Sequence, residues 1–124
     1  MQIQKTVEND LTIFTVSGTV SAEEIVTAAA EDMAAPQTLN SIWDFSQASS
    51  VRLTTAAIEK IATNLTAHAA HIGGGKVALV GSGGIQVGLG KVFKAFAALA
   101  GLPYEYRVFR KRERAEAWLR EGCG

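Results

Sequence analysis

A glycine-rich run, GSGGIQVGLGK, has the composition of a loop that binds phosphate through backbone N–H groups. It follows an apolar segment and opens a helical one, which is where such loops lie. Its spacing does not fit, because Gln86 stands where the dinucleotide fingerprint needs Gly or Ala. Ile85 and Val92 likewise replace a Gly and a Ser or Thr of the P-loop. The sequence therefore predicts no nucleotide cofactor.

A structural role explains the same glycines more simply. Glycine suits a tight turn and a close approach between a helix and a sheet. We expect Gly83 and Gly84 to form such a turn. The alternative is a protein that binds a nucleotide or another anion through the N–H groups of the Gly81–Gly90 loop, with Lys91 nearby.

Metal-binding and nucleophilic residues are few. His68 and His71 are three residues apart on a helical segment, but no carboxylate is spaced to complete a metal site. Cys123 is the single cysteine, and it lies next to the end of the chain without a nearby histidine. We expect no metal site, no cofactor and no catalytic residue.

Several polar residues follow an apolar segment that contains Trp43. Asp44 could be a base or a ligand, although a carboxylate here more often accepts backbone N–H groups where a strand turns. Hydroxyl groups at a helix start usually act as caps, and a phosphate added there is stabilised by the helix dipole. We expect a partner or ligand surface made of the loops after Phe45 and Val80 and the starts of the helices that follow them. Besides Asp44 it includes Gly83, Gly84 and Lys91, and Thr54 and Thr55 are candidate phosphoacceptors. Its hydroxyl-bearing residues are Ser46, Ser49, Ser50, Thr54 and Thr55.

A basic cluster follows near the C-terminus, with Tyr104 and Tyr106 beside it. Arginine and tyrosine together can bind nucleic acid, but the chain has no net charge and a pI of about 6.7. Charges that block pairing at the edge of a sheet explain the cluster more simply. Nucleic acid is therefore not expected as a partner. The cluster comprises Arg107, Arg110, Lys111, Arg112 and Arg114.

The elements that position these residues follow from length and composition. The chain has 124 residues, of which 48% are hydrophobic, so a single domain over 1–124 is expected. No apolar run is long enough to span a bilayer and no secretory signal pattern is present, so we expect a cytoplasmic protein. Charge is divided along the chain: three basic and eight acidic residues precede Thr63, and nine basic and four acidic residues follow from it. Such asymmetry can mark a surface for a partner, or merely uneven sampling of a solvated surface.

The first half of the chain predicts a hairpin, a helix and a strand. The alternating segments 2–7 and 11–17 read as two strands joined at Asn9-Asp10. Ser21 and Glu24 form a capping box for a helix that Pro36 stops. Residues 40–45 are an apolar strand, and 46–50 are expected to be a polar loop.

The second half alternates helices and strands. A helix that begins at Thr54 or Thr55 is expected to end at the 73–75 glycine turn. The strand 76–80 is followed by a helix to Ala100, with Gly101 as its left-handed cap. We expect Val92, Phe96 and Leu99 on the inner face of that helix. The strand 104–109 and the helix 112–121, with Ala115, Trp118 and Leu119 inward, complete the chain.

The order ββαβαβαβα predicts an α/β sandwich. Its five-stranded sheet should be mostly parallel, with one antiparallel hairpin and flanking helices. The expected core includes Ile13, Trp43, Phe45, Val80 and Phe96.

Three segments carry a resemblance to a known family. They are SIWDFS at 41–46, GGKVALVG at 74–81, and GLGKVFKAFAALAGLPYEYRVFRKRERAEAWL at 88–119. With this element order, the chain resembles the STAS domain of bacterial anti-sigma-factor antagonists. It is most similar to the SpoIIAA-like group of small bacterial proteins, also described as STAS/Sec14-type.

The resemblance implies a regulatory domain that binds a partner rather than an enzyme. The STAS switch is a serine in an Asp-Ser motif at the start of the second helix, and that motif falls here on Arg52-Leu53. The switch serine is therefore absent, and Thr54 is one residue away. The Sec14-like relation implies instead a pocket for a lipid or another small hydrophobic ligand. A structural homodimer is a further alternative.

Overall fold

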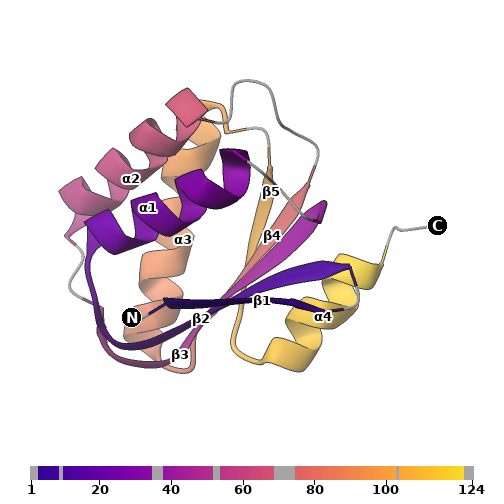
Figure 1. Ribbon diagram of the computed structural model, residues 1–124. Helices are drawn as coiled ribbons and strands as arrows, with labels where there is room; N and C mark the ends of the chain where they lie inside the picture. Colours follow the sequence, from indigo (N-terminus) through magenta and orange to yellow (C-terminus); the bar gives the residue numbers. More distant parts are fainter. Residues whose placement is uncertain are drawn as a thin grey trace.

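A computed structural model gives the arrangement of the elements (Figure 1). It describes residues 3–8, 10–34, 38–51, 54–68, 75–102 and 104–121. The five strands form one sheet in the order β1-β2-β3-β4-β5, so neighbours in the chain are neighbours in the sheet. The hairpin is antiparallel and the other three pairs are parallel, as the sequence predicts. The strands are β1 (Ile3–Glu8), β2 (Leu11–Val20), β3 (Asn40–Val51), β4 (Lys76–Val80) and β5 (Glu105–Phe109).

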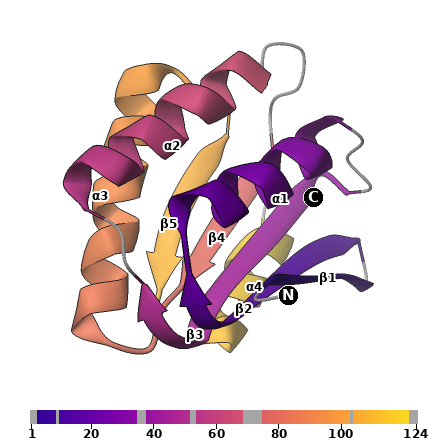
Figure 2. The same ribbon diagram turned by 60° about the vertical axis from the view of Figure 1, so that its left-hand side comes forward.

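The helices cover the two faces of the sheet unequally. Figures 1 and 2 show α1, α2 and α3 on one face, which we call the three-helix face, and α4 alone on the other, the α4 face. The predicted order ββαβαβαβα is confirmed. The helices are α1 (Ala22–Ala34), α2 (Thr55–His68), α3 (Gly84–Ala100) and α4 (Arg112–Arg120).

Local signals start and stop these elements as expected. The Ser21 N–H and hydroxyl donate to Glu24 Oε1, each at 3.1 Å, and the Glu24 N–H donates back to Ser21 Oγ at 3.3 Å. This is the reciprocal capping box. Asp10 in the hairpin turn and Gly101 at the end of α3 have φ values of 67° and 78°, the left-handed region that Asp and especially Gly tolerate.

Each face of the sheet has its own apolar cluster. On the three-helix face, the fully buried Phe14 stacks on Trp43 with 4.2 Å between ring centroids. On the α4 face, Ile13, Val80 and Trp118 belong to a second cluster. Of the predicted core residues, Ile13, Trp43 and Val80 are buried, whereas Phe45 and Phe96 are only partly buried at the margin of the core. The buried members of α4 are those predicted, Ala115, Trp118 and Leu119.

The inner face of α3 differs from the prediction. Leu99 is 84% exposed, and Val92 and Phe96 are only partly buried. Val87 and Ala97 are buried instead. A β-carbon at Gly90 would lie 3.2 Å from Val108 Cγ2, so this glycine permits the close helix–strand approach that its type suggests.

The polar stretch after Phe45 is also not the loop that we expected. It continues β3 to Val51, where it pairs only with β2, beyond the last β4 pair at Asp44. We call this two-stranded extension, Ser17–Val20 with Gln47–Val51, the arm. Figure 2 shows its strands bending together toward the start of α1. Among the arm residues whose burial is described, Thr19 and Gln47 are exposed and Val20 is buried.

Candidate functional site

The arm begins with an irregularity in the β2–β3 register. Thr15 pairs with Asp44, but the next pair is Ser17 with Gln47, so β3 holds one extra residue here. An extra residue of this kind bends a strand and increases its twist. The bend brings Ser46 to the surface at the end of the regular sheet.

Asp44 stabilises this bend. Its side chain is 5% exposed, and its Oδ1 accepts the Ser46 N–H at 2.9 Å and the Ser46 hydroxyl at 2.6 Å. This is the structural alternative that the sequence offered, a carboxylate that accepts an N–H group where a strand turns. The geometry therefore gives Asp44 a positioning role toward Ser46.

The start of α3 lies against the same bend. The Ser82 hydroxyl donates to the Ser46 carbonyl at 3.4 Å. Gly83 is the N-cap of α3 in an extended conformation, with no side-chain cap, and a β-carbon at Gly83 or Gly84 would meet nothing within 4 Å. Uncapped N–H groups of a helix start carry partial positive charge. Ser46, Ser82, Gly83 and Gly84 thus form one open surface, of which the sequence analysis missed Ser82.

The start of α2 is built differently. Thr54 Oγ1 accepts the Ala57 N–H at 3.1 Å, so this exposed hydroxyl caps α2. Thr55 is the first residue of the helix. Ser49 and Ser50 lie on β3 within the arm. Ser49 and Ser50 therefore lie in a strand rather than in the expected loop.

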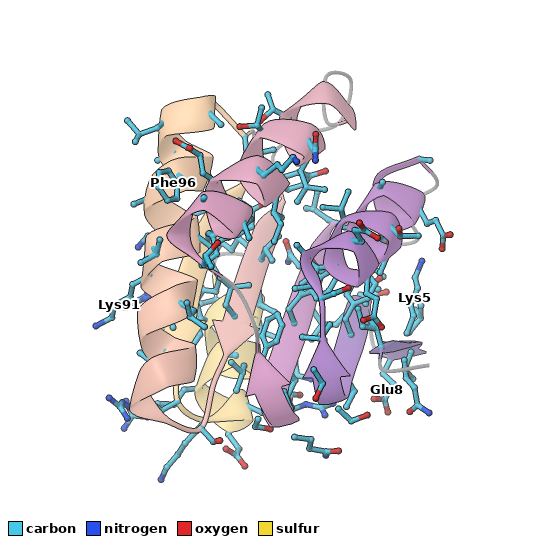
Figure 3. All side chains as sticks on the ribbon, turned by 90° about the vertical axis from the view of Figure 1, so that its left-hand side faces the viewer. Lys5, Glu8, Lys91 and Phe96 are labelled. Carbon is cyan, nitrogen blue, oxygen red and sulfur yellow. The ribbon has the colours of Figure 1, made fainter. Side chains whose placement is uncertain are left out.

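Lys91 does not lie at the helix start. It is two turns beyond Gly84, about 10 Å along the axis. Figure 3 shows its side chain pointing away from the sheet. The structure therefore brings together the bend at Ser46 and the start of α3, but not Lys91.

A second feature was not found from the sequence. An open hollow of about 410 Å³ lies where α3 meets β5. Its lining combines two cations and two tyrosines, and residues so far apart in the chain give no local sequence motif. The lining residues are Lys94, Ala98, Tyr104, Glu105, Tyr106 and Arg107.

The described part of the chain contains no group of three or more His, Cys, Asp or Glu side chains that could hold a metal ion. No helix within the described ranges is long and apolar enough to cross a membrane. His71 and Cys123 lie outside the described residues. His68 is the last residue of α2.

Comparisons with known proteins found a matching family model and solved structures of similar fold. A family model described as SpoIIAA-like matches residues 11–120. The structure is similar to that of the anti-sigma factor antagonist SpoIIAA in its unphosphorylated form, with 13% identity and a TM-score of 0.57, over 94% of this chain and 95% of the other. It is also similar to the Bacillus cell fate determinant SpoIIAA in the phosphorylated form, with 17% identity and a TM-score of 0.51, over 95% and 99%. The comparison with curated proteins gave no match.

Proposed function

The chain belongs to the SpoIIAA-like family, and from that premise we propose that it is a regulatory module that binds a partner protein and catalyses no reaction. The two solved structures of similar fold support a regulatory role, because one is an anti-sigma factor antagonist and the other a cell fate determinant. At 13% and 17% identity these structures support the fold, while the binding surface must be argued from this chain.

One observation carries the proposed surface: the uncapped start of α3 lies beside an exposed turn that a buried carboxylate stabilises. Ser46 is fixed by two hydrogen bonds to Asp44, and Gly83 and Gly84 leave open space in front of the helix N–H groups. A rigid strand bulge beside the N–H groups of a helix start suits recognition of a partner's carbonyl or carboxylate groups. Binding at the carboxyl ends of parallel strands is also the general rule for α/β sheets.

The hollow between α3 and β5 does not have the lining of a site for a small hydrophobic ligand. That hollow is open and lined by charged and phenolic side chains, whereas sites for small hydrophobic ligands are mostly apolar and enclosed.

We also propose that any phosphate switch in this chain uses Thr54 or Thr55. Thr54 is exposed and lies at the N-terminus of α2, where the helix dipole favours an added phosphate. Leu53 occupies the position that the family resemblance gives to the switch serine, and it has no hydroxyl to modify.

The test of the binding surface uses one disruptive variant and one matched control. Gly84→Arg places a long side chain in the open space at the start of α3. Ala117→Arg makes a similar change at an exposed position of α4, on the other face of the sheet. Proteins captured from native lysate by the wild-type chain and by each variant are quantified by mass spectrometry. Thermal unfolding checks that both variants fold.

We expect a partner whose recovery falls about tenfold with Gly84→Arg and stays within about twofold with Ala117→Arg, the tenfold loss corresponding to about 1.4 kcal/mol of binding. Equal recovery with both variants would contradict the proposed surface. Absence of any stoichiometric partner would contradict the proposed function.

A further inference from the structure

The outer edge of β5 presents free backbone groups. The Glu105 N–H donates to the Gly75 carbonyl, and the Gly81 N–H donates to the Phe109 carbonyl, both at 3.0 Å. In a parallel pair, alternate residues direct both backbone groups to the same neighbour. Glu105 and Phe109 therefore face β4, while the N–H and C=O groups of Tyr106 and Val108 point away from the sheet. No strand in the described residues pairs with that edge.

The hollow lies along this edge. It is bounded by Lys94 and Ala98 of α3 and by successive residues of β5. Successive residues of a strand point to opposite faces, so the hollow reaches both sides of the edge. Tyr106 packs edge-on against Phe93 with 5.2 Å between ring centroids, and this contact holds the Tyr106 ring in place in the hollow.

The lining of the hollow holds two cations and one carboxylate, and burial, with a smaller contribution from the Asp32 charge, raises the pKa of Tyr104 there. Lys94 lies on the three-helix side, and the Arg107 guanidinium stacks 5.6 Å from the ring centroid of Phe109 on the α4 side. Among the described residues, neither cation takes part in an ion pair. Glu105 is the one acidic residue in the lining, and its partner in the strand register is a cation, Lys76.

We propose that an extended acidic segment of a partner protein pairs with the free edge of β5 as a sixth strand, its carboxylates meeting Lys94 on one side and Arg107 on the other. Main-chain hydrogen bonds to Tyr106 and Val108 supply affinity, and the two cations select the sequence. This surface is separate from the start of α3, so it does not depend on the function proposed above.

The opposite edge of the sheet argues against a second copy of this chain as the occupant. Lys5 of β1 lies 3.0 Å from Asp32, and Glu8 lies 3.8 Å from Arg112. These ion pairs already engage the charges of β1, and Figure 3 shows Lys5 and Glu8 at the far side of the molecule from Lys91. Cations on an edge strand can also merely prevent aggregation, and the experiment distinguishes that case.

The probe is a synthetic peptide of four Thr-Glu-Glu repeats, because threonine favours strands and neighbouring glutamates point to opposite sides of a strand, toward Lys94 and toward Arg107. One control peptide carries N-methyl groups on every second residue, which removes backbone donors and keeps the charge. The protein variants are Lys94→Glu and, as a matched charge change away from β5, the exposed Lys60→Glu of α2. Binding is followed by amide chemical shifts in a two-dimensional NMR titration.

We expect a dissociation constant of about 0.1 mM with the largest shifts at Tyr106 and Val108. Lys94→Glu and peptide N-methylation should each weaken binding about tenfold, and Lys60→Glu by less than about twofold. No binding at about 1 mM peptide would leave the cations as protection against aggregation and overturn the proposal. Equal binding of the N-methylated peptide would also overturn it, by showing charge attraction without strand pairing. Sedimentation that shows self-association through β1 would overturn it in favour of a second copy.

Discussion

The two halves of the chain differ in whether side chains cap the N–H groups at their helix starts. In the first half, α1 has a capping box at Ser21 and α2 has a cap at Thr54. In the second half, α3 and α4 begin at Gly83 and Lys111, and neither start has a side-chain cap. The first half therefore satisfies its helix starts internally, whereas the second leaves them open.

Charge follows the same division. Because strand order in the sheet follows chain order, the acidic first half and the basic second half lie toward opposite edges of one sheet. The acidic edge uses ion pairs to α1 and α4, while several cations of the other half have no ion pair among the described residues. They are Lys91, Lys94, Arg107, Arg110, Lys111 and Arg114. Two of these cations, Lys94 and Arg107, line the hollow at β5, which supports binding of an acidic partner at that edge.

The largest expected difference between the halves is in packing. Phe14 is 1% exposed and stacked on Trp43, so Phe14→Ala should lower the free energy of unfolding by about 3–5 kcal/mol. Phe96 of α3 is partly buried, so Phe96→Ala should lower the free energy of unfolding by less than about half of the loss in Phe14→Ala. Urea titration of both variants measures the difference. Equal losses would show that the α3 side is packed as tightly as the β2–β3 centre.

A second difference concerns alkaline pH, because both tyrosines of the chain lie at the β5 edge. Burial raises the pKa of Tyr106 above its ordinary value of 10.0, with a smaller contribution from Tyr104. The neutral phenol stabilises the folded state below about pH 10, and this stabilisation is lost as pH rises, since the unfolded chain ionises first.

Tyr106→Phe removes that dependence. We expect the variant to be close to wild type at pH 8 and more stable than wild type by about 1 kcal/mol near pH 11. Urea titration at the two pH values gives the comparison, and Tyr104→Phe, whose residue is less buried, is the control. The same pH dependence in wild type and Tyr106→Phe would show that the phenol is not desolvated in solution.

Much of the fold could be predicted from the sequence because its signals are local. The box at Ser21, the cap at Thr54 and the left-handed Gly101 each depend on residues within one helical turn. The apolar strand 76–80 is predicted for the same reason. The order of the elements then follows from the alternation of strand and helix segments along the chain. Parallel pairing follows because a helix connects each strand to the next.

What the sequence did not predict depends on distant partners. The arm is a strand because Gln47–Val51 pairs with the extended end of β2, and no apolar pattern marks it. The apolar residues of α3 form two neighbouring stripes, and helical period alone does not say which one faces the sheet. Leu99 lies on the outer stripe, and the contacts of Gly90 with Val108 and of Phe93 with Tyr106 show which stripe faces the sheet. The hollow at β5 joins residues of α3 and β5, which no local motif could join.

The smallest expected effects are at the helix starts. Thr54→Ala removes the acceptor for the Ala57 N–H, so it should lower the free energy of unfolding by about 1 kcal/mol, while Thr54→Asp should stay within about 1 kcal/mol of wild type. Thr63→Ala, an exposed change inside the same helix, is the matched control and should have little effect. If Thr54→Asp keeps stability but alters partner capture, the residue is a switch. If both measurements are unchanged, Thr54 is only a cap.

Adding a cap to α3 tests whether its uncapped start serves partner binding or only makes the fold less stable. Gly83 has φ −121° and ψ 163°, an extended conformation that any residue adopts, and its β-carbon position is empty. Gly83→Ser should therefore supply the missing cap and raise the free energy of unfolding by a few tenths of a kcal/mol. The added hydroxyl would also occupy helix N–H groups that we assign to a partner, so partner capture should weaken while stability rises. Urea titration and the capture assay on the same variant measure both effects. A gain in stability with undiminished capture would place the partner elsewhere than the start of α3.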